Sequence, residues 1–421
     1  MNNWTISALK DVFYNWSSLD AAQGASLLEF MNRHFPPAVF QEHLNKRKAA
    51  IKNTQTSKNL LEGAVQSFPD VLNHRSIRSS FDSLNGFGIV FTAGGEGERL
   101  RLSLLKKGVS ADNLRDFTKA TYPLKNFFRD FGALQINLAM VRWICGKTGL
   151  DIPVIVTTGP QNSITYRVIP KILKEHQNFG LKNLRIISQD ERLHFTAEEQ
   201  AAFQIIDGSP FPITQPDETG GPLMKLKQKP DANTPSALEW LSSLGCDKIL
   251  TVQGTAIYEP AMPSLMAAAA KEHDCVGIGI PRLSFDVSDP FGTFVTIEKD
   301  GRTATRIIEQ EIRNDVTRSI TDKNSGAFLP SNTGIYAIDC GLLQNNNLPD
   351  YATPPKEVLP DLPRSPKIGY AATDILPLAK RPLILTVEPG MYAVIKTAED
   401  LETLSETGVR FGLREIVREA V

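Results

Sequence analysis

The sequence predicts an α/β fold built around a mainly parallel β-sheet. From Gly86 onward, short apolar runs typical of buried strands alternate with longer runs that have helical spacing. Such alternation indicates crossover connections, which produce parallel strands. With 421 residues, of which 41% are hydrophobic, the chain is also long enough to bury a large core.

The first segment, residues 1–82, is expected to be helical. Apolar residues recur at helical spacing within Leu9–Phe13 and within Ala22–Met31, and Pro36-Pro37 marks a stop. In the segment that follows, the expected strands are Ile152–Thr157, Leu184–Ser188, Lys248–Val252 and Cys275–Ile280, and the expected helices are Ile164–His176 and Ala261–Lys271.

The composition becomes richer in short β-type runs after Pro290. Gly292–Ile297 and Thr303–Ile308 flank Asp300-Gly301, a dipeptide that favours a hairpin turn, and Asn332–Ile338 is a further strand. Residues 345–370 are rich in proline and asparagine and are expected to be a functional loop or a loose linker. The tail, with a strand at Ile384–Val387 and a helical end, is expected to pack as a small module. The predicted division is therefore 1–82, 83–344 and 345–421.

Charge and cysteine usage narrow the classes of partner. A formal net charge of −1 offers no whole-chain attraction to nucleic acid or to an acidic membrane surface, so local basic residues must hold any anionic small-molecule substrate. The four cysteines are far apart and form no metal-binding spacing, which predicts reduced and mostly buried thiols. No secretory leader and no run of about 18 apolar residues is evident. We expect a soluble, cytoplasmic protein that does not bind a membrane; its oligomeric state stays open.

A glycine loop directly follows the predicted strand that contains Ile89 to Phe91. Gly94, Gly95 and Gly97 allow the backbone to curl so that several N–H groups face phosphate oxygens, and Arg99 adds a forked cation. A Walker loop would end in Gly-Lys-Ser/Thr, and a dinucleotide fingerprint would need glycine at Leu100, so neither fits. An ordinary glycine turn is the alternative interpretation.

A second short motif follows at Lys119-Ala120-Thr121-Tyr122-Pro123. Lys119 could reach a phosphate, although an isolated lysine is more often a solvated surface residue. Together, Gly94–Leu100 and Lys119–Pro123 resemble the paired motifs of the sugar-1-phosphate nucleotidyltransferases. The resemblance implies a Rossmann-like, GT-A-like nucleotidyltransferase domain in which Arg99 and Lys119 act on phosphates. Arg101 stands where the family usually has glycine.

Gln215-Pro216-Asp217-Glu218-Thr219-Gly220-Gly221 resembles the uracil loop of the UDP-sugar pyrophosphorylases, especially the UDP-N-acetylhexosamine branch. Pro216 fixes its own φ, while Gly220 and Gly221 allow a close approach of the backbone to a base edge. A solvated turn would suit the same composition.

Further positions follow the order of the family motifs. The resemblance implies that Gln189 contacts the uridine, that Glu309 accepts sugar hydroxyls and that Asn332 contacts the sugar. Met391–Leu401 is similar to a late family segment, in which Lys396 would be a third catalytic residue that binds phosphate. Each residue alone also fits an exposed face or a strand edge.

A second position, after Arg101, departs from the family. The strand Lys248–Val252 runs into Gln253, where the family carries an aspartate that helps to hold Mg²⁺. A neutral amide is a poorer ligand for Mg²⁺ than a carboxylate. Three explanations stay open: phosphates and water hold the expected Mg²⁺, another carboxylate such as Asp217, Asp289 or Asp374 substitutes, or catalysis is lost.

The resemblance implies a uridylyltransferase that joins UTP and a hexose-1-phosphate, or an N-acetylhexosamine-1-phosphate, to give UDP-sugar and pyrophosphate. Such a reaction needs positioning and charge stabilisation rather than a covalent enzyme intermediate. Two alternatives stay open: a catalytically silent protein that binds UTP or UDP-sugar, which Gln253 would distinguish, and a Rossmann-type oxidoreductase, which the glycine spacing disfavours.

Overall fold

A computed structural model describes residues 3–95, 97–124, 130–285, 289, 291–355, 357 and 362–421. Glu96 of the predicted glycine loop, and residues 356 and 358–361 of the predicted connector, lie outside these ranges. Contacts group the chain into two discontinuous units. Unit 1 contains 1–60, 190–221 and 348–372, and unit 2 contains 61–189, 222–347 and 373–421. The three contiguous segments predicted from the sequence stay a prediction, and the contacts group the chain differently.

Unit 2 is built on an 11-stranded mixed sheet that is mostly parallel along its main path. In spatial order, this path consists of β2 (Val71–Asn73), β18 (Pro382–Thr386), β12 (Cys275–Arg282), β15 (Phe328–Asp339), β10 (Lys248–Gln253), β3 (Phe87–Thr92), β4 (Val154–Thr158) and β5 (Leu184–Ser188). Only β15 runs antiparallel to its neighbours along this path, between β12 and β10. The predicted α/β class with a mainly parallel sheet is confirmed.

The remaining strands of the large sheet extend it at β15. They are β1 (Val65–Ser67), β13 (Thr293–Lys299) and β14 (Arg302–Ile308). β13 and β14 form the hairpin predicted from Asp300-Gly301, and both turn residues have positive φ, 52° and 70°. That geometry suits the right-handed twist of paired strands, which explains the preference for an Asp-Gly turn.

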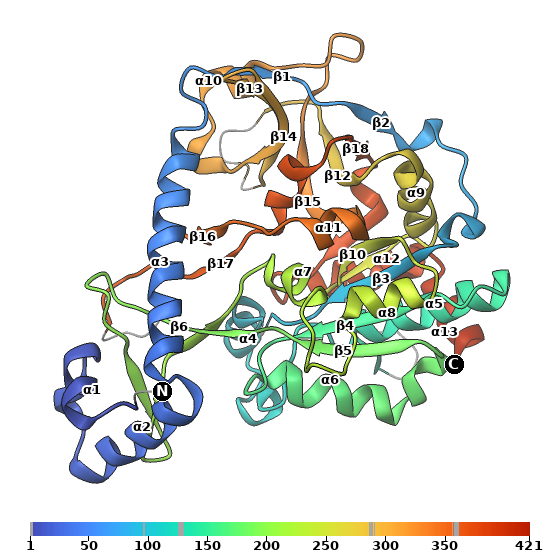
Figure 1. Ribbon diagram of the computed structural model, residues 1–421. Coiled ribbons are helices and arrows are strands. Elements are labelled where there is room, and N and C mark those ends of the chain that lie inside the picture. The colour runs from blue at the N-terminus through green and yellow to red at the C-terminus, as the bar shows by residue number, and fades with distance from the viewer. Residues whose placement is uncertain are drawn as a thin grey trace. The chain divides into compact units, whose positions relative to one another are not determined.

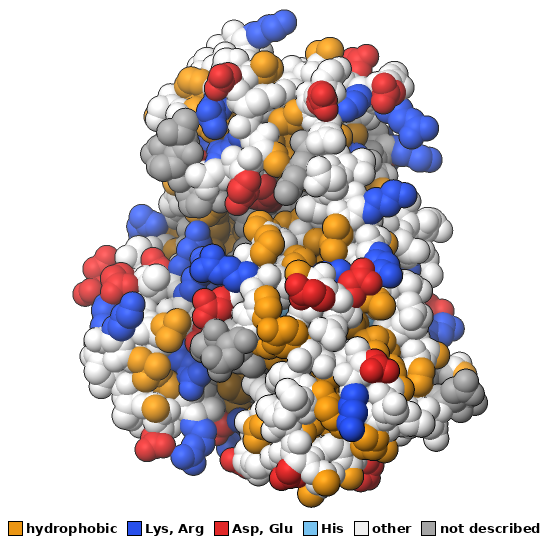
Figure 2. All heavy atoms as spheres, turned by 90° about the vertical axis from the view of Figure 1, so that its left-hand side faces the viewer, with side chains coloured by type: hydrophobic (Ala, Val, Ile, Leu, Met, Phe, Trp, Pro, Cys, Tyr) orange, Lys and Arg blue, Asp and Glu red, His pale blue; other side chains and the backbone are white. Residues whose placement is uncertain are grey.

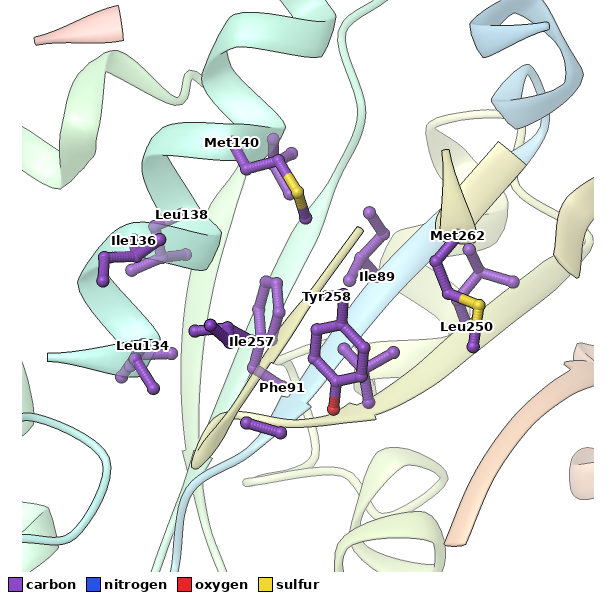
Figure 3. Packing of buried hydrophobic residues seen from close by; sticks show 14 of the residues in the cluster. Ile89, Phe91, Leu134, Ile136, Leu138, Met140, Leu250, Ile257, Tyr258 and Met262 are labelled. Carbon is purple, nitrogen blue, oxygen red and sulfur yellow. The ribbon is translucent and has the colours of Figure 1, made fainter. Parts of the chain in front are cut away.

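Helices accompany the sheet of unit 2. They are α4 (Glu98–Lys106), α5 (Ala133–Thr148), α6 (Ile164–Glu175), α7 (Gly221–Leu226, whose first residue is grouped with unit 1), α8 (Ala237–Ser243), α9 (Met262–Ala269), α10 (Asp315–Ser319), α11 (Cys340–Asn345), α12 (Asp400–Arg410) and α13 (Leu413–Ala420). α13 packs beside α5 (Figure 1). Figure 3 shows Ile89 and Phe91 of β3 packed in one cluster with Leu134 of α5 and Leu250 of β10.

The C-terminal tail is built into unit 2. β18 lies between β2 and β12 in the main sheet, and a short strand, β19 (Tyr392–Val394), pairs with β11 (Ala256–Tyr258). The sequence pattern reveals a strand and a helical end here, but it does not reveal which strands they join. The contacts group this part of the tail with unit 2.

Unit 1 combines three helices with three short strand pairs. The helices are α1 (Ile6–Val12), α2 (Ala21–His34) and α3 (Pro37–Lys58), and the pairs are β6 (Glu191–Leu193) with β9 (Thr214–Pro216), β7 (Phe203–Ile206) with β8 (Ser209–Pro212), and β16 (Asp350–Ala352) with β17 (Ile368–Tyr370). Leu27 and Met31 of α2 share a buried cluster with Phe13, Phe195 and Phe203. The helical start of the chain thus packs on a segment about 190 residues later, as α2 does on β8.

Surface charge is mixed. On the face shown in Figure 2, Lys and Arg side chains are interspersed with Asp and Glu side chains, in keeping with the formal net charge of −1. All four cysteines are free thiols, and Cys145, Cys246 and Cys275 are buried. Among the residues that the structure describes, no helix has the length and apolar character needed to cross a membrane.

Candidate functional site

The candidate site begins where the parallel strands β3, β4 and β10 end. Parallel strands deliver the residues after their carboxyl ends to one edge of a sheet, which is where α/β folds bind ligands. A Cβ on Gly94 would lie 2.8 Å from Nε2 of Gln189 and 2.9 Å from the backbone nitrogen of Gly159. Gly94 therefore lets the loop after β3 approach the segment after β5, and it brings two predicted nucleotide-binding residues together.

The glycine loop leads into helix α4. Gly97 has φ +74° and precedes Glu98, the first residue of the helix, while Arg99 lies exposed in its first turn. Free backbone N–H groups and the helix dipole at such an N-terminus favour an anion. Gly95 is exposed, and a Cβ there would meet none of the described residues within 4 Å.

The three predicted catalytic cations all lie in unit 2 and interact electrostatically. Burial lowers the pKa of Lys119, and the positive charges of Lys396 and Arg99 lower it further, while Asp400 acts in the opposite direction. Lys119 also packs on the loop, because a Cβ on Gly97 would lie 2.6 Å from the Lys119 Cβ. Like charges gathered at one place are unfavourable unless an anion joins them, so the cluster suits a polyphosphate.

Lys396 comes from the distant tail and is fixed by its backbone. Its N–H donates to Oδ2 of Asp400 at 2.8 Å, and the neighbouring Ile395 N–H donates to the Thr255 carbonyl at 3.3 Å. β19, just before it, pairs with β11, which begins three residues after Gln253. The strand pair therefore delivers Lys396 next to the carboxyl end of β10.

The two predicted sugar-binding residues are linked through Gly292. A Cβ on Gly292 would lie 3.1 Å and 3.2 Å from the two carboxylate oxygens of Glu309, and the Asn332 N–H donates to the Gly292 carbonyl at 2.8 Å. Asn332 Oδ1 accepts from the Tyr336 hydroxyl at 3.1 Å, which fixes the amide. Burial raises the pKa of Glu309, and the nearby Glu311 carboxylate adds to this effect.

Gln253 ends β10 and faces the segment that carries Asn332. Its Nε2 donates to the Thr333 carbonyl at 3.1 Å, and a Cβ on Gly334 would lie 3.2 Å from the same nitrogen. The hydroxyl of buried Tyr258 accepts from the Gln253 N–H at 2.8 Å and donates to the Gln253 carbonyl at 3.0 Å. The amide therefore serves a backbone contact at the position where the family places a carboxylate.

The carboxylates considered as metal ligands have other surroundings. Asp217 pairs with Arg192 in unit 1, and Asp289 pairs with Arg282 at 2.7 Å. Burial raises the pKa of Asp374 to about 6, and Arg306 opposes this rise. Within the described ranges, no group of three or more His, Cys, Asp or Glu side chains is arranged to hold a metal ion. At the end of β10, Gln253 therefore offers Mg²⁺ a neutral amide oxygen in place of a carboxylate, which is the poorer ligand.

The predicted uracil loop belongs to unit 1. Asp217 pairs with buried Arg192, whose guanidinium also bonds Asp350 at 2.9 Å and lies over the Tyr370 ring at 4.5 Å. The Gly220 N–H donates to the Tyr370 carbonyl at 2.7 Å. Pro216 ends β9, and Gly221, which starts α7, donates its N–H to the Asp217 carbonyl at 3.1 Å. These bonds hold residues 216–221 in place, so the loop is not an unsupported turn.

Sequence reasoning missed several residues that shape these elements. Arg192 and Tyr258 act through contacts with residues that motifs identify, namely Asp217 and Gln253. An arginine in a strand and a tyrosine in an apolar run carry no local signal for such roles. The late segment contains Asp400-Leu401, but only the structure shows that the Lys396 N–H donates to the Asp400 carboxylate.

No protein-family model matches the chain, and no curated protein matches it significantly. Solved structures do match. A Trypanosoma brucei UDP-N-acetylglucosamine pyrophosphorylase superposes with a TM-score of 0.66 at 13% identity, covering 93% of this chain and 79% of that one.

Two further structures agree with this match. An Entamoeba histolytica protein described as a UDP-N-acetylglucosamine pyrophosphorylase gives a TM-score of 0.63 at 16% identity, with 82% of this chain and 88% of that one covered. A Leishmania major UDP-glucose pyrophosphorylase variant superposes with a TM-score of 0.58 at 15% identity, covering 92% of this chain and 79% of that one. The chain therefore has the fold of the UDP-sugar pyrophosphorylases, as the motif resemblance predicts.

Proposed function

We propose that this protein is a uridylyltransferase that forms UDP-sugar and pyrophosphate from UTP and a sugar-1-phosphate. The observation that carries the proposal is the cluster of Arg99, Lys119 and Lys396 beside the glycine loop. Three interacting cations, of which Arg99 and Lys119 lie beside the N-terminus of α4, suit a triphosphate together with a second phosphate. The same unit carries Glu309 and Asn332, and the fold is shared with UDP-sugar pyrophosphorylases.

In the proposed reaction, a phosphate oxygen of the sugar-1-phosphate attacks the α-phosphorus of UTP in line, and pyrophosphate leaves. Arg99 and the amides of the glycine loop hold the β- and γ-phosphates, Lys119 stabilises charge on the α-phosphate or the leaving group, and Lys396 binds the sugar phosphate. Preorganised cations of this kind lower the barrier by stabilising charge as it develops. No covalent enzyme intermediate is needed.

In the proposed complex, the loop of residues 215–221 contacts the uracil and Gln189 contacts the uridine. Glu309 accepts sugar hydroxyls, which its carboxylate does best when ionised. Mg²⁺ stays an expectation from the resemblance, and no step is assigned to it because Gln253 offers an amide where the family has a carboxylate. The cytoplasmic location and the absence of nucleic acid or membrane partners also stay predictions.

A second candidate is a protein that binds UTP or UDP-sugar without turnover. The observation that favours it is Gln253, whose amide is bonded to Thr333 at the position where the family has a metal-binding aspartate. A protein of this kind would keep the cations and the glycine loop.

One assay separates the two candidates. Purified protein is incubated with each nucleoside triphosphate, each of several sugar-1-phosphates and Mg²⁺, and pyrophosphate and nucleotide sugar are measured together. Both products with UTP and a hexose-type sugar-1-phosphate are expected. Calorimetric binding of UTP with neither product in any combination would favour the binding protein.

A further inference from the structure

The side chain of Lys396 rests on an aromatic ring. Its Nζ lies 4.2 Å from the centroid of the Phe291 ring, well within the range of a cation–π interaction. Phe291 is 40% exposed, so its ring is not absorbed into the core. Among the residues that the structure describes, no carboxylate forms an ion pair with Lys396. The ring is therefore the observed partner of this ammonium.

The backbone of Phe291 is held on both sides. Its N–H donates to Oδ1 of Asp289 at 2.9 Å, and its carbonyl accepts from Arg282 at 3.3 Å. Arg282 is 7% exposed, pairs with Asp289 at 2.7 Å and donates to the Leu329 carbonyl at 2.9 Å. Arg282 therefore bonds both Asp289 and the Phe291 carbonyl, and these bonds support the backbone of Phe291.

The ring also has a defined place along the chain. Phe291 directly precedes Gly292, which accepts a hydrogen bond from the Asn332 backbone and at which a Cβ would lie 3.1 Å from the carboxylate of Glu309. The Phe291 ring itself contacts Lys396, whose positive charge lowers the pKa of Lys119. Phe291 thus connects the residues proposed for the sugar with those proposed for phosphate.

A ring and a carboxylate would hold Lys396 in different ways. A carboxylate would cancel the charge and would have to be displaced by an incoming phosphate. An aromatic face attracts the ammonium through its quadrupole and leaves the full positive charge in place. A cation held by a ring is therefore both positioned and available to a phosphate oxygen.

We propose that Phe291 is a positioning residue that holds the Lys396 ammonium ready for the phosphate of the sugar-1-phosphate. This inference rests on the proposed function, because Lys396 must act on substrate phosphate. It assigns Phe291 an effect through Lys396, with no bond made or broken at the ring. Loss of the ring should weaken use of the sugar-1-phosphate more than use of UTP.

The kinetic test compares Phe291→Leu, which removes the aromatic face, with Phe291→Tyr, which keeps it. We expect Leu to lower kcat/KM for the sugar-1-phosphate about three- to tenfold and Tyr to stay within about twofold of the parent. Phe411→Leu is the matched control, because the Phe411 ring lies against Arg410 rather than against Lys396 or a residue that holds Phe291. Equal losses in the Leu and Tyr variants, or no loss in either, would overturn the inference.

A double-mutant cycle separates action through Lys396 from direct contact with substrate. In a Lys396→Ala background, Phe291→Leu should change kcat/KM by less than about twofold, because residues in contact are not additive. A full additional loss in that background would contradict the inference.

A spectroscopic measurement keeps the inference testable even if the protein proves to be catalytically silent. The εCH₂ protons of Lys396, assigned with Lys396→Arg in selectively ¹³C-labelled protein, should show an upfield ring-current shift. The shift should vanish in Phe291→Leu and persist in Phe291→Tyr. Absence of the shift in the parent protein would overturn the positioning role of Phe291 and leave the proposed function untouched. A shift that is present in a protein without turnover would count against the proposed function and leave the contact between Phe291 and Lys396 in place.

Discussion

Gly97 packs directly against Lys119: a Cβ at position 97 would lie 2.6 Å from the Cβ of Lys119, and Gly97 has φ +74°. The short distance to Lys119 leaves no space for a Cβ at position 97. The positive φ disfavours other residues, because a left-handed conformation costs an L-residue about 1–2 kcal/mol. Glycine is therefore needed here on two counts. The loop and the lysine form one structural element despite the separation of their motifs in sequence.

The Gly97→Ala variant should displace either the loop or Lys119. We expect kcat/KM for UTP to fall by about 10²-fold, since a shift of about 1 Å at a reacting group can cost that much. Gly108→Ala is the matched control, because Gly108 also has positive φ (+85°) but has open space around its Cβ. If both variants lose activity equally, strain rather than the contact with Lys119 is responsible.

Lys396→Ala should lower the rate of UDP-sugar formation by about 10² or more, as expected for loss of an electrostatic donor in the transition state. The Lys396 side chain is exposed, and its backbone bond to Asp400 does not need the side chain. Folding should therefore be preserved, which circular dichroism and thermal unfolding can check. An unchanged rate in the folded variant would refute the role assigned to Lys396.

Local motifs predict which candidate residues lie near one another better than they predict the architecture around those residues. Gly94, Gly97, Lys119 and Gln189 lie in or beside motifs that follow strands, and parallel strands bring such positions to one edge. Periodicity likewise predicts the strands and the hairpin turn at Asp300-Gly301. These features depend on a few neighbouring residues, so the sequence displays them directly.

The sequence does not show which strands and side chains that are distant along the chain lie next to each other in the fold. β15 looks like any other buried strand, yet it runs antiparallel between β12 and β10. The contact between Phe291 and Lys396 spans more than 100 positions and belongs to no motif. Arg192 reaches Asp217 and Asp350 from a short strand. Such contacts depend on the three-dimensional path of the chain, for which a single sequence gives no spacing rule.

The alkaline limit of activity should respond to charge near Lys119. Its pKa lies below the ordinary value because of burial and the nearby positive charges of Lys396 and Arg99, so it loses its proton at lower pH than a free lysine. Arg99→Gln removes one of these charges without removing a titrating group. We expect the alkaline limb of kcat/KM to move to higher pH, whatever happens to the maximum rate.

Arg101→Gln is the control for this pH profile, since Arg101 lies on the same helix and is not among the charges that lower the pKa of Lys119. A limb that stays in place in Arg99→Gln, or that moves equally in both variants, would count against Lys119 as the titrating group.

Asp374 should make folding less favourable as the pH rises. Its pKa is about 6 in the folded protein against an ordinary value of 3.8, mainly because of burial. Between these values, the folded state binds more protons than the unfolded state, so the free energy of unfolding falls with rising pH. The effect reaches up to about 3 kcal/mol above pH 6, at about 1.4 kcal/mol per pKa unit.

Asp374→Asn should therefore be more stable than the parent above about pH 6, and the gain should shrink toward pH 4. Urea unfolding at several pH values measures this difference, and Asp315→Asn serves as the control because that side chain is fully exposed. A stability difference that does not depend on pH would exclude titration of Asp374 as the cause.

The last prediction concerns the end of β10, where Gln253 takes the place of the expected aspartate. We expect Gln253→Asp to make turnover more strongly dependent on Mg²⁺, because a carboxylate is the kind of oxygen ligand that this cation prefers. Gln253→Asn is the matched control, since it has the same shortened side chain without the charge. Both variants lose the reach of the Gln253 amide to the Thr333 carbonyl, so comparing them isolates the effect of charge.

Initial rates across a Mg²⁺ titration at fixed UTP should rise more steeply in the Asp variant than in the Asn variant. Superimposable titrations would mean that position 253 does not face the phosphates, and the contact with Thr333 would then be the main role of Gln253.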